Sequence, residues 1–350
     1  MTLPISFTRM FEIDVDIRKA RTLPSEFYID PSFYELSKEK IFAKTWQFLG
    51  RASDVDALSP ANILPGFLDE PILIVKSDDS LHCLSNVCTH RGKILVEEPC
   101  SANLIRCGYH GRRFSLDGRF LSMPEFDDVE NFPSDNDDLD QIPFAVRQGF
   151  MFASIDPVMN FEELVGDAAQ RFADDDYDRS KLRLTDIKKY EVDAHWALYC
   201  ENYLEGFHIP YVHKALNEIV DYGTYSTDTF QYTSLQTAYD DGGKVAARYL
   251  FIFPNTMFNF YPWGISVNVV RPVSPSKCVV EFLTYIQDGG SMAGGAGDDL
   301  HGVELEDEAV VESVQKGIRS RFYSQGRYSP TREQGTHHFH RLIAQFMNKQ

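Results

Sequence analysis

Residues 88–110 read CTHRGKILVEEPCSANLIRCGYH, and this stretch decides the fold of the first half of the chain. It holds two cysteine–histidine pairs, Cys88 with His90 and Cys107 with His110, each beside glycines that allow a tight turn. Each pair can therefore be presented at the tip of a hairpin, and two such tips make one site with four ligands. The composition of the chain gives a chance match of roughly 10⁻⁴ for this spacing, so the signal is strong.

Two kinds of metal site accept two cysteines and two histidines. Zinc binds such a set in a closed tetrahedron. Zinc fingers usually pair cysteine with cysteine, however, whereas here each loop supplies one residue of each type. In a Rieske [2Fe–2S] centre one iron takes both thiolates and the other takes both imidazoles. We therefore favour an iron–sulfur cluster and keep zinc as the alternative. Cys83 and Cys100 lie outside the pattern and are expected to be packed thiols.

A second cluster of polar residues occupies residues 200–214, which read CENYLEGFHIPYVHK. A helix is expected over about 195–208, and it places Glu201, Glu205 and His208 on one face. A proline should then end the helix, so that His213 approaches from beyond the break. A non-heme Fe(II) that activates O₂ commonly takes two histidines and one carboxylate on one face. An amphipathic helix with a polar exposed face is the alternative interpretation.

The rest of the chain predicts two domains. Short strands with turn signals fill residues 44–155, whereas strand-like runs and helical segments follow. Later strands are expected at 226–239, 247–253, 264–271 and 278–286, and helices at 160–173 and 305–322. The strand-like runs leave too few residues for crossover helices, so antiparallel pairing is favoured. We predict an α+β chain, with a small all-β domain over 44–155 and a larger domain from 1–43 and 156–350.

The two motifs together resemble those of a known family. Cys88, His90, Cys107 and His110 are spaced as in the Rieske non-heme iron oxygenases, the terminal oxygenase (α) subunits of the aromatic-ring-hydroxylating dioxygenase family. The resemblance implies a Rieske [2Fe–2S] domain and a catalytic domain whose antiparallel sheet wraps on a long helix, a helix-grip or START-like fold. It also implies an enzyme that activates O₂ at a mononuclear Fe(II), with electrons relayed through the cluster, to hydroxylate an organic substrate of the aromatic ring type.

The resemblance also assigns residues of the second motif. His208 and His213 match iron ligands, Glu205 matches the acid that links the two metal centres, and Asn202 matches a residue near the iron. Most members have aspartate where this chain has Glu205. In the family the bridge crosses a subunit boundary, from His208 to a cluster histidine, His110 here. The resemblance therefore implies a homotrimer, and the length of the chain favours α₃ over α₃β₃.

The third iron ligand is expected to be a carboxylate that lies far along the chain. In the family it opens a late helix, and the matching stretch is residues 303–308. Asp307 is our choice because it precedes a Glu-x-Val-Gln run as in the family, and Glu304 is the alternative. The late histidines His337, His338 and His340 are more typical of packing than of another metal site.

Composition and charge restrict the partners. The chain carries 34 Lys and Arg against 52 Asp and Glu, a net charge of −18, which argues against binding nucleic acid. No stretch of 18 uncharged apolar residues is present, so we expect a cytoplasmic protein without membrane contact. No dinucleotide-binding fingerprint follows a strand. Electrons derived from NAD(P)H should therefore come from a separate reductase, with or without a ferredoxin.

The sequence leaves the substrate open. Three features favour a quaternary-ammonium monooxygenase of the choline, carnitine or betaine type. They are the short chain, Glu205 and the run that begins at Glu306. Several aromatic residues could form a cation–π cage, although they are more typical of a sheet core. They are Tyr249, Phe251, Phe253, Phe258, Phe260, Tyr261 and Trp263. The non-enzyme alternative is a Rieske electron carrier, which would have the cluster but no mononuclear iron.

Overall fold

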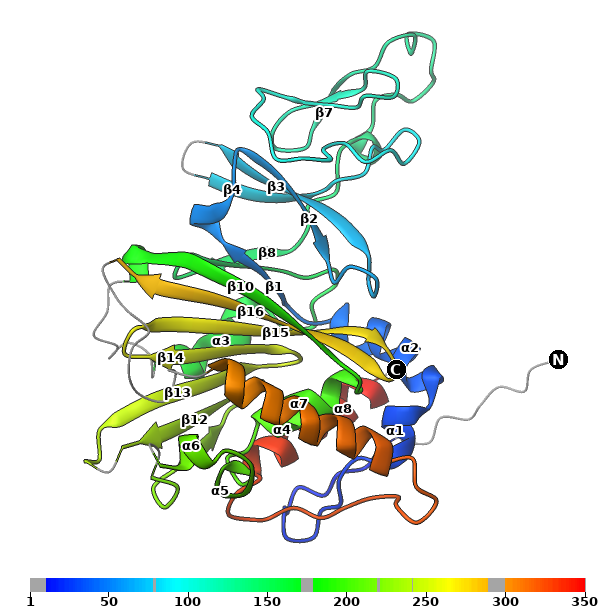
Figure 1. Ribbon diagram of the computed structural model, residues 1–350. Helices are drawn as coiled ribbons and strands as arrows, with labels where there is room; N and C mark the ends of the chain where they lie inside the picture. Colours follow the sequence, from blue (N-terminus) through cyan, green and yellow to red (C-terminus); the bar gives the residue numbers. More distant parts are fainter. Residues whose placement is uncertain are drawn as a thin grey trace, which may run out of the picture. The chain divides into compact units, whose positions relative to one another are not determined.

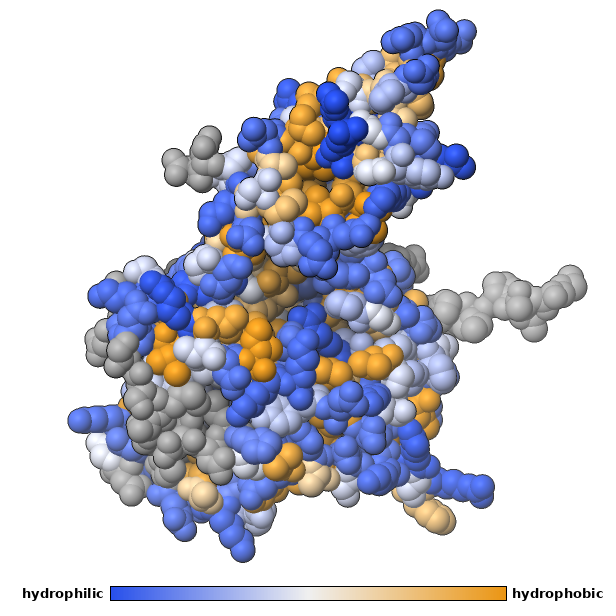
Figure 2. Space-filling view, turned by 45° about the horizontal axis from the view of Figure 1, so that its top comes forward, coloured by the Kyte–Doolittle hydropathy of each residue, from blue (hydrophilic) through white to orange (hydrophobic). Residues whose placement is uncertain are grey.

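The chain divides into two units, Ala43–Val158 and the remainder on either side of it. The structure is a computed structural model that describes residues 11–77, 80–170, 179–218, 221–240, 242–288 and 300–349. The unit boundaries lie within three residues of the 44–155 domain expected from the sequence. Among the described residues, no helix is long and apolar enough to cross a membrane, and the cytoplasmic location stays a prediction. Figure 2 shows hydrophilic residues over most of the surface in view, with apolar patches between them.

The smaller unit is built from three antiparallel sheets of three strands each (Figure 1). Their strands are β1 (Gln47–Arg51), β9 (Phe150–Ala153) and β8 (Phe144–Arg147); β2 (Leu58–Ile63), β3 (Glu70–Ser77) and β4 (Ser80–Ser85); and β5 (Ile105–Arg106), β6 (Arg113–Phe114) and β7 (Phe120–Ser122). The apolar run that begins at Pro71 forms the predicted hairpin, in which Ile72 pairs with Ser85. Its turn residues 78 and 79 lie outside the described part. Two 3-10 helices complete the unit, η2 (Ala52–Asp54) and η3 (Asp135–Asp137).

The larger unit contains one seven-stranded antiparallel sheet. In spatial order its strands are β10 (Leu182–Val192), β16 (Lys277–Gln287), β15 (Gly264–Ser274), β14 (Thr256–Tyr261), β13 (Val245–Ile252), β12 (Thr233–Tyr239) and β11 (Ser226–Thr229). Gly264 has φ +155°, and a Cβ there would lie 2.1 Å from the Tyr285 carbonyl oxygen. Only glycine therefore allows β15 to start this close to β16.

Helices cover this sheet and carry the second motif. They are α1 (Ser25–Ile29), α2 (Pro31–Ser37), the π-helix η1 (Lys38–Phe42), α3 (Phe161–Gln170), the 3-10 helix η4 (Arg179–Lys181), α4 (Trp196–Tyr203), α5 (Ile209–Val212), α6 (Lys214–Asn217), α7 (Leu300–Gly317) and α8 (Gln334–Asn348). In Figure 1, α4, α7 and α8 lie across one face of the sheet. At Gly335 in α8 a Cβ would lie 2.3 Å from the Leu204 carbonyl oxygen, so α8 packs directly on the end of α4.

Several sequence predictions of helices and strands were wrong or incomplete. The strand expected over 226–239 is a hairpin of β11 and β12. The helix expected over 195–208 ends at Tyr203, where the Leu204 N–H donates to the carbonyls of both Cys200 and Glu201. The helix expected over 305–322 starts and ends about five residues earlier, as α7. The sequence prediction also missed β10, β14 and α8. The strand β10 is an exposed edge strand with many charged residues, so it lacks the apolar signal of a buried strand.

Candidate metal centres

The two cysteine–histidine loops of the smaller unit have the same backbone geometry. In each, the cysteine N–H donates to the carbonyl five residues later, at 2.8 Å, and a glycine N–H four residues later donates back to the cysteine carbonyl. These glycines are Gly92 and Gly111, with φ +71° and +77°, in the left-handed region that favours glycine. The loops therefore present Cys88 and Cys107 in equivalent ways.

The four predicted cluster ligands gather at these loops. The side chains of Cys88 and Cys107 are neighbours, and each residue is 2% exposed. Burial is the main cause that raises the pKa of the Cys88 thiol, and the contact with Cys107 adds to it. The His90 and His110 rings have their centroids 4.8 Å apart, and His110 is exposed. Paired thiols and a separate pair of imidazoles fit a cluster whose two irons take different ligands.

The remaining cysteines of this unit behave differently. Cys83 is buried, and burial raises the pKa of its thiol to about 12. Cys100 is exposed, so the prediction of a packed thiol was wrong at this position. The reason is its place on the surface beside Leu58, with which it forms only a backbone bridge.

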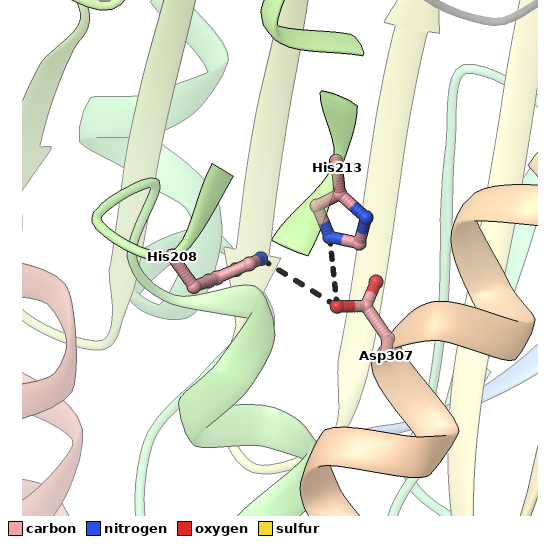
Figure 3. Close-up of side chains that lie close together, drawn as sticks. All are labelled: His208, His213 and Asp307. Atoms are coloured by element: carbon pink, nitrogen blue, oxygen red, sulfur yellow. Dashed lines mark hydrogen bonds and ion pairs between the residues drawn. The ribbon is translucent and has the colours of Figure 1, made fainter. Parts of the chain in front are cut away.

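The larger unit brings His208, His213 and Asp307 together (Figure 3). His208 precedes α5, His213 follows it, and Asp307 lies on α7. The Asp307 Oδ1 atom lies 3.0 Å from His213 Nε2 and 3.5 Å from His208 Nε2. One ligand atom from each residue lies within 4.8 Å of the others. This is the donor set of a facial triad, with two imidazoles and one carboxylate.

Two further carboxylates fix the orientation of the histidine rings. His208 Nδ1 lies 2.7 Å from Glu205 Oε1, and His213 Nδ1 lies 2.7 Å from Glu306 Oε2. Because an ionised carboxylate only accepts, it holds the ring N–H on Nδ1 and leaves Nε2 for a metal. The Glu205 Oε2 atom also accepts from the backbone N–H groups of Phe207 and His208. Glu306 was not predicted, because its contact with His213 joins residues 93 positions apart.

The structure corrects the expected helical face of the second motif. Glu201 turns away from the metal triad, and its Oε1 lies 2.7 Å from the Tyr28 hydroxyl and 3.1 Å from His340 Nε2. Glu205 and His208 meet through a turn rather than on one helix, because α4 ends before them. The late histidines lie in α8, where His340 is fully buried and contacts the Tyr328 hydroxyl at 2.6 Å.

The alternative third ligand, Glu304, lies one turn before Asp307 on α7. It is 2% exposed, and its Oε2 accepts from the Tyr199 hydroxyl at 2.5 Å. Its Oε1 has no hydrogen-bond partner among the described residues. Burial raises the pKa of this carboxyl to about 8. Glu304 is therefore close to Asp307 in the sequence, but its carboxyl group is held by the Tyr199 hydroxyl.

A cavity of about 110 Å³ adjoins the triad. It is lined by five tyrosines, by the carboxylates of Glu205, Glu304 and Asp307, and by Asn202. The tyrosines are Tyr199, Tyr203, Tyr225, Tyr249 and Tyr261. Among the described lining residues there is no lysine or arginine. Cavities for drug-sized ligands measure about 300–1,000 Å³, so this one suits a small molecule.

The aromatic residues proposed from the sequence are divided between this cavity and the core. Tyr249 and Tyr261 line the cavity. Phe253 instead packs in the core against Phe346 of α8, with ring centroids 5.1 Å apart. The sequence analysis missed Tyr199 and Tyr203, although their spacing of four residues on a helix places them on one face.

Comparisons with known proteins match both parts of the chain. Residues 45–133 match the Rieske [2Fe-2S] domain, and residues 222–349 match the ring hydroxylating alpha subunit (catalytic domain). Choline monooxygenase, chloroplastic, of Arabidopsis thaliana is 30% identical over 362 residues, covering 95% of this chain and 84% of that protein. The carnitine monooxygenase oxygenase subunit of Escherichia coli (strain K12) is 29% identical, covering 94% of each.

Solved structures give the same result. The quaternary ammonium Rieske monooxygenase CntA in complex with L-carnitine has a TM-score of 0.79 and 28% identity, covering 95% of this chain and 97% of that one. Naphthalene 1,2-dioxygenase from Rhodococcus sp. has a TM-score of 0.74 at 17% identity, covering 93% and 94%, and shares the fold. These likenesses confirm the predicted fold class.

Proposed function

The chain belongs to the family of Rieske-type ring-hydroxylating oxygenases, which are oxidoreductases with a [2Fe–2S] cluster and a mononuclear iron. From this premise we propose that it is the oxygenase component of a monooxygenase for a small quaternary ammonium compound. The cavity beside the triad is the observation that carries the proposal, because tyrosine rings and carboxylates surround it.

The proposed ligands follow from the two clusters. Cys88 and Cys107 hold one iron of the cluster, and His90 and His110 hold the other. The proposed ligands of the mononuclear Fe(II) are His208, His213 and Asp307. When bound, the cluster supplies electrons and the Fe(II) supplies a site where O₂ is activated. The residues of the chain would bind these groups and hold the histidine tautomers.

The lining of the cavity favours a cation over a neutral or anionic substrate. Aromatic faces attract cations, most strongly where water is excluded. The acidic residues Glu205, Glu304 and Asp307 line the cavity, and the described lining residues include no lysine or arginine. Glu304 has one oxygen without a hydrogen-bond partner among the described residues, and a bound cation would favour the ionised form of this carboxyl against the burial that raises its pKa to about 8. A quaternary ammonium group cannot donate hydrogen bonds, and this lining offers it charge and π faces instead.

The named relatives support the same class of substrate. Proteins 28–30% identical to this chain are described as choline and carnitine monooxygenases. An aromatic ring is the second candidate substrate, because apolar tyrosine faces also accept one. The carboxylates in the cavity make it the weaker candidate.

Electron supply and assembly are part of the proposal. A separate NAD(P)H-dependent reductase, with or without a ferredoxin, delivers the electrons. We expect a homotrimer in which Glu205 of one chain links His208 to His110 of the next. A CntA structure is described as giving insights into inter-subunit electron transfer. The contact between Glu205 and His208 Nδ1 supports the half of this link that lies within one chain.

The test is O₂ uptake by the protein with a reductase, measured with product analysis against choline, carnitine, γ-butyrobetaine and naphthalene. We expect uptake coupled to product with at least one quaternary amine. Coupled turnover of naphthalene alone would support the second candidate. Reduction of the cluster without oxygenation of any substrate would contradict the proposal and support the non-enzyme alternative, a Rieske electron carrier.

A further inference from the structure

A buried cation lies two residues after the cluster ligand His110. Arg112 is 2% exposed, and three phenylalanine rings surround its guanidinium. The guanidinium carbon lies 4.8 Å from the Phe120 centroid, 5.5 Å from that of Phe132 and 5.7 Å from that of Phe114. An arginine almost never loses its charge in a protein, so this apolar cage holds a permanent positive charge.

Asp137 provides the counter-charge. Its Oδ1 accepts from Arg112 Nη2 at 2.7 Å, and its Oδ2 accepts from the Ser134 N–H and hydroxyl at 2.8 and 3.0 Å. The Asp137 side chain is 19% exposed against 2% for Arg112. Water therefore screens the negative partner more than the positive one. Arg112 is the main cause that lowers the pKa of Asp137 against the effect of burial.

The same pair connects both cluster loops. The Asp137 carbonyl accepts from Arg112 Nη2 at 3.0 Å and from the Thr89 hydroxyl at 2.8 Å. Thr89 lies between the ligands Cys88 and His90, while the Arg112 carbonyl accepts from the Cys107 N–H at 2.8 Å. The acidic segment around residues 125–140 therefore places Asp137 against the residues that adjoin the cluster ligands.

A buried charge beside a redox group alters its reduction potential. Charges interact more strongly in a poorly polarisable interior than in water. The potential of an iron–sulfur cluster depends on nearby charge, on hydrogen bonds and on solvent exposure. A positive charge stabilises the reduced cluster, which carries one more electron, and a negative charge stabilises the oxidised one.

We propose that the Arg112–Asp137 ion pair sets the reduction potential of the cluster, with Arg112 raising it and Asp137 offsetting that effect. This inference rests on the cluster ligands proposed above, but it is independent of the substrate. Arg112 and Asp137 are positioning residues, because they act on the cluster through their contacts with the Cys88 and Cys107 loops and through the electrostatic field of their charges.

The test is a redox titration of the cluster-loaded full chain, followed by its EPR signal. Arg112→Gln should lower the midpoint potential, because it leaves the Asp137 charge alone beside the cluster. Asp137→Asn should raise it, because the Arg112 charge is then uncompensated. The double variant should return towards the original value. Arg113→Gln is the matched control, since Arg113 is the exposed neighbour and its charge is screened.

A purely structural role predicts a different pattern. Loosened loops admit water in either variant, so both shifts would then have the same sign. Shifts of the same sign, or an unchanged potential in Asp137→Asn, would overturn the proposal. If Arg112→Gln fails to retain the cluster, Arg112→Lys keeps the charge and should hold a potential close to the original. A large shift in Arg112→Lys with the cluster intact would also overturn it.

Discussion

Glu306 Oε2 lies 2.7 Å from His213 Nδ1, on the side of the ring opposite to Asp307. Glu205 stands in the same relation to His208. Each histidine of the triad is therefore held by a carboxylate that leaves its Nε2 free for the metal. Such contacts fix the tautomer and the direction of a ligand ring before any metal binds.

Glu306→Ala should weaken iron binding by roughly 10- to 100-fold, because His213 loses the partner that orients it. Glu306→Gln should weaken it less, since the amide oxygen still accepts from Nδ1. Iron retention against a competing chelator measures both. Glu218→Gln, an exposed position after α6, is the control. Unchanged retention in Glu306→Ala would show that the contact does not orient the ligand.

Glu304→Gln should raise the KM for a quaternary amine by about tenfold, or about 1.4 kcal/mol, because the amide cannot carry the negative charge that attracts the cation. The iron content should not change, because Asp307 is the proposed ligand. Glu218→Gln, the same change at an exposed position, is the matched control. Loss of iron in Glu304→Gln would instead identify Glu304 as the third ligand.

Glu205→Gln should keep both metal centres and the trimer but lose most turnover. The amide has nearly the shape of the carboxylate, but it lacks the negative charge that stabilises the linked imidazoles. Iron content, light scattering and O₂ uptake separate these effects. A fully active variant, or a monomer in the unmodified protein, would contradict the proposed link.

His195 should make the protein less stable in acid. It is the N-cap of α4, where its Nδ1 accepts from the Ala197 N–H at 3.3 Å, and burial lowers its pKa to about 3. Between about pH 6.5 and 3 the unfolded chain binds a proton here that the folded chain does not. The free energy of unfolding should therefore fall by up to about 1.4 kcal/mol per pH unit as the pH drops.

His195→Asn keeps a capping side chain and removes this titration. Its free energy of unfolding, measured by denaturant titration between pH 7 and 5, should depend less on pH. The comparison uses the slope, since the smaller side chain also changes absolute stability. An equal slope in both proteins would rule out His195 as the source.

The sequence predicted those parts of the sites that are local in the chain. The Cys88 and Cys107 loops repeat one short pattern with glycines, and His208 and His213 lie five residues apart. Glu306 and Arg112 carry no such signal, because their roles depend on partners 93 and 25 positions away. The end of α4 at Tyr203 was also missed, because the sequence periodicity continues past the point where α8 packs against the Leu204 carbonyl.

Metal analysis of three proteins tests whether this one chain holds two different iron sites, as we propose. The unmodified protein should contain about three irons per chain, two in the cluster and one at the triad. Cys107→Ala should keep only the triad iron, and His213→Ala should keep only the cluster and its EPR signal. A protein that holds zinc at the cysteine loops, or a His213→Ala variant that loses no iron, would contradict the presence of two different iron sites in this chain.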